Sequence, residues 1–256
     1  YFPKLCLVQI ANSNSAIIID ALAVKNLESL EELLSCKDVI KVFHSPRQDM
    51  EIFYNLFKKL PKNIFDTQIA ASFLGENEQI SYEKLVEKYL NIKINKNNQF
   101  CNWATRPLNY SQINYALSDV TYLREIYIKL SYQLSKLNRL DWATEESQKF
   151  LDIKLYERNP LIYWKKIKFN KNKKIALNKL KLLTQWREEK CIKYNVTRNF
   201  LLSDKNIINL LSIKNLSEND ISRYSEKNLT SEEKKEVLKI LSLKENSSIN
   251  QNFKKI

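Results

Sequence analysis

Residues 111–130, SQINYALSDVTYLREIYIKL, predict an amphipathic helix around which the rest of the chain is organised. Apolar residues recur along it at helical spacing and define one face that we expect to be buried. That face consists of Ile113, Ala116, Leu117, Val120, Leu123, Tyr127 and Leu130. A second stripe beside it consists of Tyr115, Asp119, Tyr122 and Ile126.

Asp119 is the unusual member of the second stripe. A carboxylate at the edge of an apolar face costs free energy unless a partner neutralises it, and a metal ion is one candidate. Residues four apart lie one above the other on a helix, so Tyr115 and Asp119 point the same way. This spacing also occurs often by chance, so the pair alone does not decide between a metal site and an ordinary helix.

The net charge of +13 is unevenly distributed along the 256 residues. Residues 1–155 hold 19 Lys and Arg against 18 Asp and Glu, whereas residues 156–256 hold 23 against 11. Eight lysines fall between Lys165 and Lys181. A solvated surface explains part of this excess, but the asymmetry favours a C-terminal region that binds a polyanion.

The composition excludes several classes of site. A single Gly offers no glycine-rich phosphate loop or dinucleotide fingerprint. The four cysteines are scattered without a Cys-x-x-Cys pair, which argues against zinc and favours a reduced, cytoplasmic location. No run of about eighteen apolar residues predicts a transmembrane helix. The chain begins at Tyr1 and its one Met is Met50, so we expect the natural start to lie upstream.

Strands and helices alternate in the first part of the chain. Leu5–Ile10 and Ala16–Asp20 predict a hairpin, and further strands are expected at Val39–Phe43 and near Ile64. Ser45 is expected to cap a helix that has Pro46 in its first position. Helices are also expected at 26–34, 68–74, 81–90 and from 141 to about 156.

From about Asn159 onward the pattern predicts helices only, at 175–194, 203–211 and 230–243. Thr230 and Glu233 have the spacing of a capping box at the start of the last one. Alternating strands and helices followed by helices alone predict an α/β domain joined to an all-α domain.

Most of the candidate functional residues have an ordinary structural explanation when they are taken singly. Asp49 in the first turn of a helix is a common partner of the helix dipole. His44 fits a packed residue at a strand end. Trp103 and Arg106 fit anchors of a loop, and the lysine run fits an exposed face.

Six segments, taken together and in order, resemble ribonuclease D, a member of the DEDD exonuclease superfamily. They are YFPKLCLVQIA (1–11), VFHSPRQDMEIF (42–53), IFDTQIAASFLG (64–75), SYEKLV (81–86), NWATRPL (102–108) and YALSDVTYL (115–123). A seventh, LTQWREEKCIKYNVTRNFLLSD (183–204), is similar to the first half of an HRDC domain, a helical nucleic-acid-binding module.

The resemblance implies a ribonuclease-H-like α/β domain, with a mixed sheet flanked by helices, over residues 1–157. It implies a basic linker and HRDC domain over 158–245 and a polar tail over 246–256. The chemistry implied is hydrolysis by two divalent ions, Mg²⁺ or Mn²⁺, held by four carboxylates. Oxygen ligands suit such hard ions.

Roles for individual residues also follow from the resemblance. Asp49 and Asp119 match metal ligands, and Tyr115 matches a tyrosine that orients the attacking water. Asp66 and Gln48 match supporting positions. The residues expected to contact nucleic acid are Gln99, Trp103, Arg106, Lys165, Lys166, Lys168, Lys171, Lys173 and Lys174.

One part of the family pattern is absent from the chain. The first motif, Asp-x-Glu, would supply the other two carboxylates, and its strand would lie between Leu5–Ile10 and Val39–Phe43. The matching position precedes Tyr1. We therefore expect the sequence to be a fragment of a longer protein and inactive by itself.

For the parent protein, the resemblance implies a 3′→5′ exoribonuclease that trims RNA 3′ ends, with tRNA precursors as the expected substrates. RNA is the expected partner, with no membrane and no obligate protein partner. Two alternatives stay open: a non-catalytic RNA-binding module, and a DNA 3′→5′ exonuclease of the same superfamily.

Overall fold

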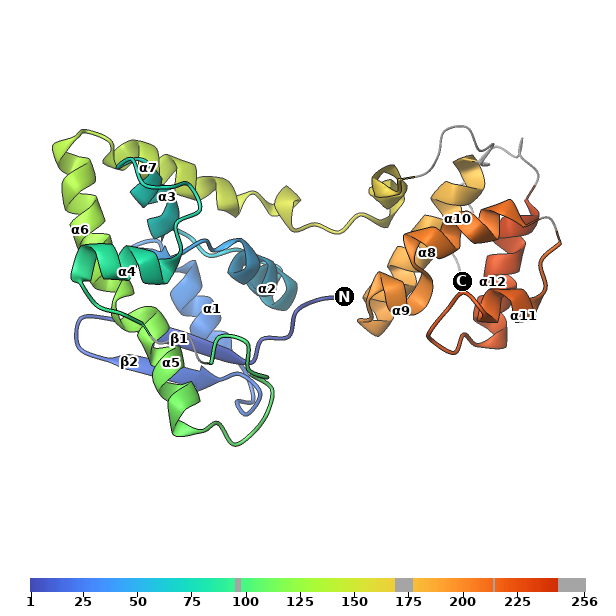
Figure 1. Ribbon diagram of the computed structural model, residues 1–256, viewed down its shortest axis with the longest axis horizontal. Helices are drawn as coiled ribbons and strands as arrows, with labels where there is room; N and C mark the ends of the chain where they lie inside the picture. The colour runs from blue at the N-terminus through green and yellow to red at the C-terminus, as the bar shows by residue number, and fades with distance from the viewer. Residues whose placement is uncertain (95–97, 169–176, 214, 244–256) are drawn as a thin grey trace. The chain divides into compact units, whose positions relative to one another are not determined.

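The computed structural model of the chain describes residues 1–94, 98–168, 177–213 and 215–243 (Figure 1). The chain divides into two compact units. The first is Pro3–Glu157, and the second combines Arg158–Ile256 with Tyr1–Phe2. The tail expected at 246–256 lies outside the described residues.

The first unit begins with the expected hairpin. Strands β1 (Leu7–Ala11) and β2 (Ala16–Asp20) pair antiparallel. Asn12 closes the turn between them, because its Oδ1 accepts hydrogen bonds from the N–H groups of Asn14 and Ser15 at 2.8 and 2.9 Å. An Asn that bonds to the backbone two residues further on is typical of tight turns.

A second strand pair is parallel. Strands β3 (Lys41–Phe43) and β4 (Ile64–Asp66) are joined through helix α2 (Arg47–Phe57). Parallel neighbours need such a crossover connection, and a helix is its usual form.

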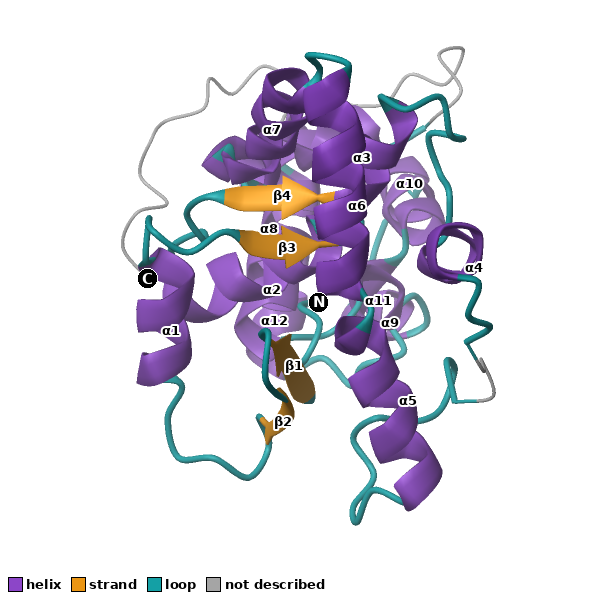
Figure 2. Ribbon diagram, turned by 90° about the vertical axis from the view of Figure 1, so that its left-hand side faces the viewer, coloured by secondary structure: helices purple, strands orange, loops and turns teal. Residues whose placement is uncertain are grey.

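Helices lie on both faces of the β3–β4 pair (Figure 2). Val42 packs against the apolar cluster of α3, α4, α6 and α7, whereas Phe43 packs against that of α1 and α2. Successive strand residues point to opposite faces, so the pair is a middle layer between helices. These helices are α1 (Glu28–Ser35), α3 (Thr67–Ser72), α4 (Tyr82–Leu90), α6 (Leu123–Lys136) and α7 (Leu140–Gln148), and two short turns of 3₁₀ helix follow them, η1 (Lys149–Leu151) and η2 (Ile153–Leu155).

The two strand pairs are separate. Within the described residues β1 pairs with β2 alone and β3 with β4 alone. A cavity of about 540 Å³ is lined by residues of both β1 and β3, among them Val8, Ile10 and Val42. The single mixed sheet implied by the resemblance is therefore represented by two strand pairs with an apolar cavity that borders both.

The helix predicted over the amphipathic stretch is wrong in one respect, because the structure has two helices there. Helix α5 (Tyr110–Thr121) ends at Tyr122, and α6 begins at the next residue. The hydroxyl of Tyr82 donates to the carbonyl of Ser118 at 3.1 Å. That carbonyl is the regular helical acceptor for the N–H of Tyr122, which bonds to Val120 instead. Insertion of a side chain into the ladder of i→i−4 hydrogen bonds is one of the identified causes of a helix kink.

This break also changes which residues are buried. Ile113 was expected on the buried face but is 36% exposed, whereas Ile126 of the second stripe is fully buried. The two helices do not share one continuous face, so a single helical period across both assigns these residues wrongly.

Helix α2 begins one residue later than expected. Ser45 was predicted to be its N-cap, but Pro46 occupies that position and makes no side-chain capping bond. Ser45 has a φ of +57°, and its N–H donates to Oδ1 of Asp66 at 2.9 Å. A long-range bond to β4 therefore replaces the local cap.

The second unit is all-helical in its described residues. The predicted capping box is confirmed, because Thr230 and Glu233 exchange side-chain-to-backbone hydrogen bonds at the start of the last helix. No helix in the described parts of the chain has the length and apolar character needed to cross a membrane. The elements are η3 (Pro160–Lys166), α8 (Leu177–Tyr194), α9 (Arg198–Leu202), α10 (Asp204–Ser212), α11 (Glu218–Ser222) and α12 (Ser231–Ser242).

Glu188 of α8 is the centre of a buried charge network in this unit. Its side chain is fully buried and accepts hydrogen bonds from Arg187 and Arg198. The hydroxyl of Tyr1 also donates to it, at 2.8 Å. Arg187 also forms an ion pair with Asp204 at 2.6 Å. Both buried residues of this network, Arg187 and Glu188, thus have partners of opposite charge.

We expect Glu188→Ala to lower the free energy of unfolding by about 3–5 kcal/mol, because it removes the shared acceptor of two arginines. The control is Glu31→Ala, which breaks a more exposed pair with Lys59 and should cost about 1 kcal/mol or less. Urea unfolding followed by tryptophan fluorescence measures both. Equal losses for the two variants would contradict the importance of the network.

Candidate functional site

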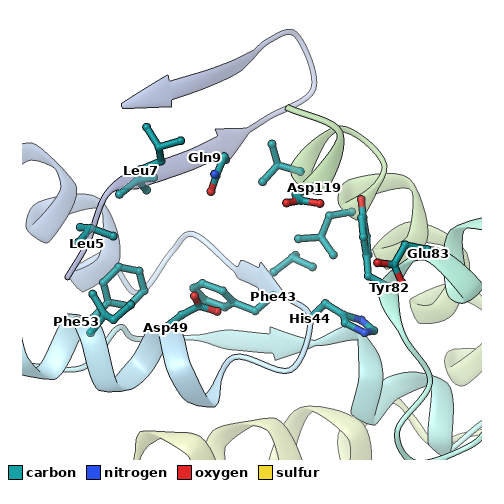
Figure 3. Close-up of a pocket in the computed structure, with 15 residues that line it drawn as sticks. Leu5, Leu7, Gln9, Phe43, His44, Asp49, Phe53, Tyr82, Glu83 and Asp119 are labelled. Atoms are coloured by element: carbon teal, nitrogen blue, oxygen red, sulfur yellow. The ribbon is translucent and has the colours of Figure 1, made fainter. Parts of the chain in front are cut away.

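A pocket of about 340 Å³ lies in the first unit, where β1, β3, α2, α4 and α5 meet (Figure 3). Asp49 lines it from the first turn of α2, and Asp119 lines it from the last turns of α5. Glu83 of α4 and His44, just after β3, lie on its opposite side from Leu5 and Phe53. The two aspartates expected from the resemblance therefore enter one pocket from different helices.

Packing of α2 explains the position of Asp49. Met50 is fully buried and Phe53 is 7% exposed, which fixes the helix against the core. The turn before α2 is held by Asp66, whose Oδ1 accepts hydrogen bonds from Ser45 and Gln68 at 2.9 Å each. Asp66 is itself buried, so it supports the start of α2 and does not line the pocket.

Both aspartates have raised pKa values. The pocket walls surround the Asp49 carboxyl although the residue keeps an exposed surface, and this partial removal from water raises its pKa to about 6. Burial, followed by the charge of Glu83, raises the pKa of Asp119 to about 6. Ionising either group therefore costs more free energy than ionising an ordinary aspartate, and a nearby positive charge would offset that cost.

The donor atoms of this pocket suit a hard cation only in part. Two carboxylates are the ligands that Mg²⁺ and Mn²⁺ prefer, and their raised pKa values fit groups that lack a cationic partner. In the ranges that the structure describes, however, no group of three or more His, Cys, Asp or Glu is arranged to hold a metal ion. The described residues thus supply two of the four carboxylates implied by the resemblance.

Tyr115 lies one helical turn before Asp119 and is half-buried. Its ring packs against that of Trp103, with centroids 5.9 Å apart. Burial, and next the charge of Asp119, raise the pKa of Tyr115 to about 12, so the hydroxyl keeps its proton at neutral pH. It does not line the pocket itself.

Arg106 is engaged by the protein. All five of its N–H groups donate, to both carboxylate oxygens of Asp20 and to the carbonyls of Cys6, Trp103 and Thr105. A substrate phosphate would have to displace one of these bonds. The contacts therefore favour a bracing role for Arg106 over the phosphate contact expected from the resemblance.

The other expected residues are not brought to the pocket. Gln48 and Gln99 are exposed, and neither lines it. Lys165, Lys166 and Lys168 are exposed in the second unit. Lys171, Lys173 and Lys174 lie outside the described residues.

Sequence reasoning missed Glu83 as a member of the pocket. A glutamate in the first turn of a helix is ordinary on dipole grounds, so its position carried no signal. His44, in contrast, is a packed residue as expected. Its Nδ1 lies 2.9 Å from Oγ1 of Thr67, and its Nε2 lies 3.1 Å from the carbonyl oxygen of Ile80.

Comparison with known proteins places this chain in a family. A family model described as 3'-5' exonuclease matches residues 1–135. Ribonuclease D of Sphingobium indicum is 39% identical over 225 residues, which is 87% of this chain and 58% of that protein. The chain thus spans less than two thirds of the length of this curated relative.

Solved structures of nucleases are similar to this chain as well. Escherichia coli RNase D, an exoribonuclease involved in structured RNA processing, matches with a TM-score of 0.84 and 26% identity over 96% of this chain and 68% of that one. Brucella melitensis NrnC with bound Mg²⁺ matches with a TM-score of 0.53 and 28% identity over 59% of this chain and 75% of that one. The fold is therefore the ribonuclease-H-like 3′-5′ exonuclease fold, and the chain belongs to the 3′-5′ exonuclease family, with similarity to ribonuclease D over most of its length.

Proposed function

We propose that the protein to which this chain belongs is a 3′→5′ exoribonuclease of the ribonuclease D type. The observation that carries the proposal is the pairing of Asp49 and Asp119 in one pocket of a chain from this exonuclease family. The RNA-processing role of the similar Escherichia coli enzyme supports RNA as the substrate class. Precursor tRNA, in the cytoplasm, is the substrate that we expect.

Asp49 and Asp119 would hold divalent metal, with Mg²⁺ or Mn²⁺ as the candidates and two ions as the number. The Mg²⁺ bound to the similar NrnC supports this assignment. When bound, such ions activate a water molecule and stabilise charge on the phosphate. The raised pKa values of both aspartates mean that their ionised forms cost free energy in the pocket, and a bound cation would offset that cost.

The Tyr115 hydroxyl would orient the attacking water. It is protonated at neutral pH and lies one turn from Asp119, so it can donate one hydrogen bond and accept another near that carboxylate. Asp66 would support the site by fixing the turn before α2. Gln48, which is exposed on α2, would be a second supporting residue.

RNA would be bound partly by the second unit, which we assign as a basic linker and HRDC domain over 158–245 following the nuclease domain 1–157. Lys165, Lys166 and Lys168 are exposed there, and phosphate contacts by such lysines release counterions. Trp103 and Gln99 of the first unit are the remaining candidates for RNA contact, with Trp103 offering an aromatic ring.

The function is tested with the purified full-length protein, Mg²⁺ and an RNA that has a single-stranded 3′ extension. We expect stepwise release of nucleotides, and Asp119→Asn should slow it by about 10²-fold or more, because a ligand of the charge-stabilising ions is lost. A DNA tail of the same sequence is the substrate control. Faster cleavage of the DNA would favour the DNA exonuclease, and no release of either would favour an RNA-binding module.

The same substitution should stabilise the metal-free chain at neutral pH. The pKa of Asp119 is about 6 in the folded protein against 3.8 ordinarily, so the folded state holds the proton more tightly and loses stability as pH rises from about 4 to about 6. At pH 7.5 in a chelator, Asp119→Asn should raise Tm by about 2–4 °C. At pH 3.5 the Asp119 carboxyl is mainly protonated and therefore neutral, like the Asn that replaces it. The difference in Tm between the wild type and Asp119→Asn should then disappear.

The control for this stability measurement is Asp38→Asn, at an exposed aspartate between α1 and β3. It should leave Tm nearly unchanged at both pH values. A loss of stability for Asp119→Asn at pH 7.5 would show that the carboxylate has a favourable partner without metal.

Replacing Lys165, Lys166 and Lys168 with Ala should weaken RNA binding. It should also make the plot of log K against log salt concentration less steep by about 2, because each lost phosphate contact removes roughly 0.7 from the slope. The matched control replaces Lys58, Lys59 and Lys62, three exposed lysines of the first unit, and removes the same charge. Binding is measured by fluorescence anisotropy between 50 and 200 mM salt. Equal slopes for the two triple variants would mean that Lys165, Lys166 and Lys168 form only a solvated face.

A further inference from the structure

Arg106, in the segment between α4 and α5, bonds to the β-hairpin through Asp20. Asp20 ends β2, and its Oδ1 and Oδ2 each accept a hydrogen bond from Arg106 at 2.6 Å. Two parallel bonds between a guanidinium and a carboxylate fix orientation as well as distance. The Arg106 guanidinium, ahead of smaller effects, holds the pKa of Asp20 below its usual range, so the carboxylate stays ionised in this pair.

Arg106 also bonds to the backbone of Trp103. One Nη1 bond of Arg106 ends on the carbonyl of Trp103 at 2.8 Å, and an Nη2 bond ends on the carbonyl of Cys6 at 3.2 Å. The guanidinium thus holds the backbone of Trp103 at a fixed place relative to the strand that contains Asp20.

Trp103 in turn contacts the candidate water-orienting residue. Its ring lies 5.9 Å from the ring of Tyr115, centroid to centroid, with 31° between the ring planes. Tyr115 is only half-buried, so this neighbour restricts where its hydroxyl points. A misplacement of about 1 Å at a reacting group costs on the order of 10²-fold in rate.

The ends of the same segment are tied to α5 separately. Asn98 donates to Ser111 at 2.7 Å, and Asn109 forms a capping box with Gln112. These bonds fix the start of α5 without involving the hairpin. Loss of the Asp20–Arg106 pair would therefore release Trp103 while α5 keeps its own cap.

We propose that Asp20 is a positioning residue, which acts through Arg106 and Trp103 to hold the Tyr115 ring in its working orientation. Asp20 touches neither the pocket nor, in this scheme, the substrate. The inference rests on the proposed role of Tyr115. In this scheme the bonds of Arg106 to Asp20 and to the carbonyl of Trp103 both serve to place the Trp103 ring.

The test is a double-mutant cycle in the full-length protein with Mg²⁺ and a 3′-extended RNA. Asp20→Ala should lower kcat about 10-fold and change KM less than about 2-fold, because it displaces a group that acts on the attacking water. Tyr115→Phe should lower kcat by about 10²-fold. In the Tyr115→Phe background, Asp20→Ala should have little further effect, because the hydroxyl that it positions is gone.

Two variants guard against a loss of fold. Asp20→Asn keeps one acceptor oxygen for Arg106, so it should fall between the wild type and Asp20→Ala in kcat. Glu31→Gln breaks the Lys59–Glu31 pair elsewhere in the unit and should leave kcat and KM unchanged.

Each outcome is decisive. An equal drop in kcat from Asp20→Ala in both backgrounds, or a drop in Tm with kcat unchanged, overturns the positioning role and leaves the proposed function intact. Full kcat for Tyr115→Phe alone refutes the role of Tyr115 itself, and the inference with it. Coupling between the two substitutions, together with intermediate kcat for Asp20→Asn, supports the proposal.

Discussion

Asp66 connects four parts of the first unit through its carboxylate and its backbone N–H. It ends β4, accepts hydrogen bonds from Ser45 before α2 and Gln68 in α3, and its own N–H donates to Ser147 of α7 at 3.0 Å. Burial raises its pKa, and the bonds from backbone N–H groups oppose that rise. Because Asp66 holds the turn at Ser45, it helps to set where α2 begins, and together with the packing of Met50 and Phe53 it places Asp49. The pocket therefore depends on a residue that does not line it.

Glu188 of the second unit differs from Asp49 and Asp119 of the first in the charges that surround it. Glu188 is enclosed by Arg187, Arg198 and the Tyr1 hydroxyl, so its charge is matched inside the protein. The pKa values of Asp49 and Asp119 rise instead, mainly through burial. A charged partner inside the protein stabilises the ionised form of a carboxylate, whereas burial without such a partner disfavours it.

Local patterns predicted the hairpin, the capping box at Thr230 and the element types of the first unit, because each depends on residues a few positions apart. The break at Tyr122 depends on Tyr82, which is 36 positions from Ser118, and the engagement of Arg106 depends on Asp20, 86 positions away. No local period contains such bonds. The pairing of Asp49 with Asp119 was expected only through the resemblance, and Glu83 was missed because its position looks like a normal helix start.

Tyr1 and Phe2 belong to the second unit, although the first unit begins at Pro3. The Tyr1 hydroxyl finds its acceptor 187 positions later in the chain, on α8. At synthesis rates of about 5–20 residues per second, the ribosome needs roughly 10–40 seconds to cover that separation. Residues Pro3–Glu157 are therefore synthesised while Tyr1 still lacks its acceptor. The bond between Tyr1 and α8 can form only after those residues have left the ribosome, which makes it a late contact in the assembly of the second unit.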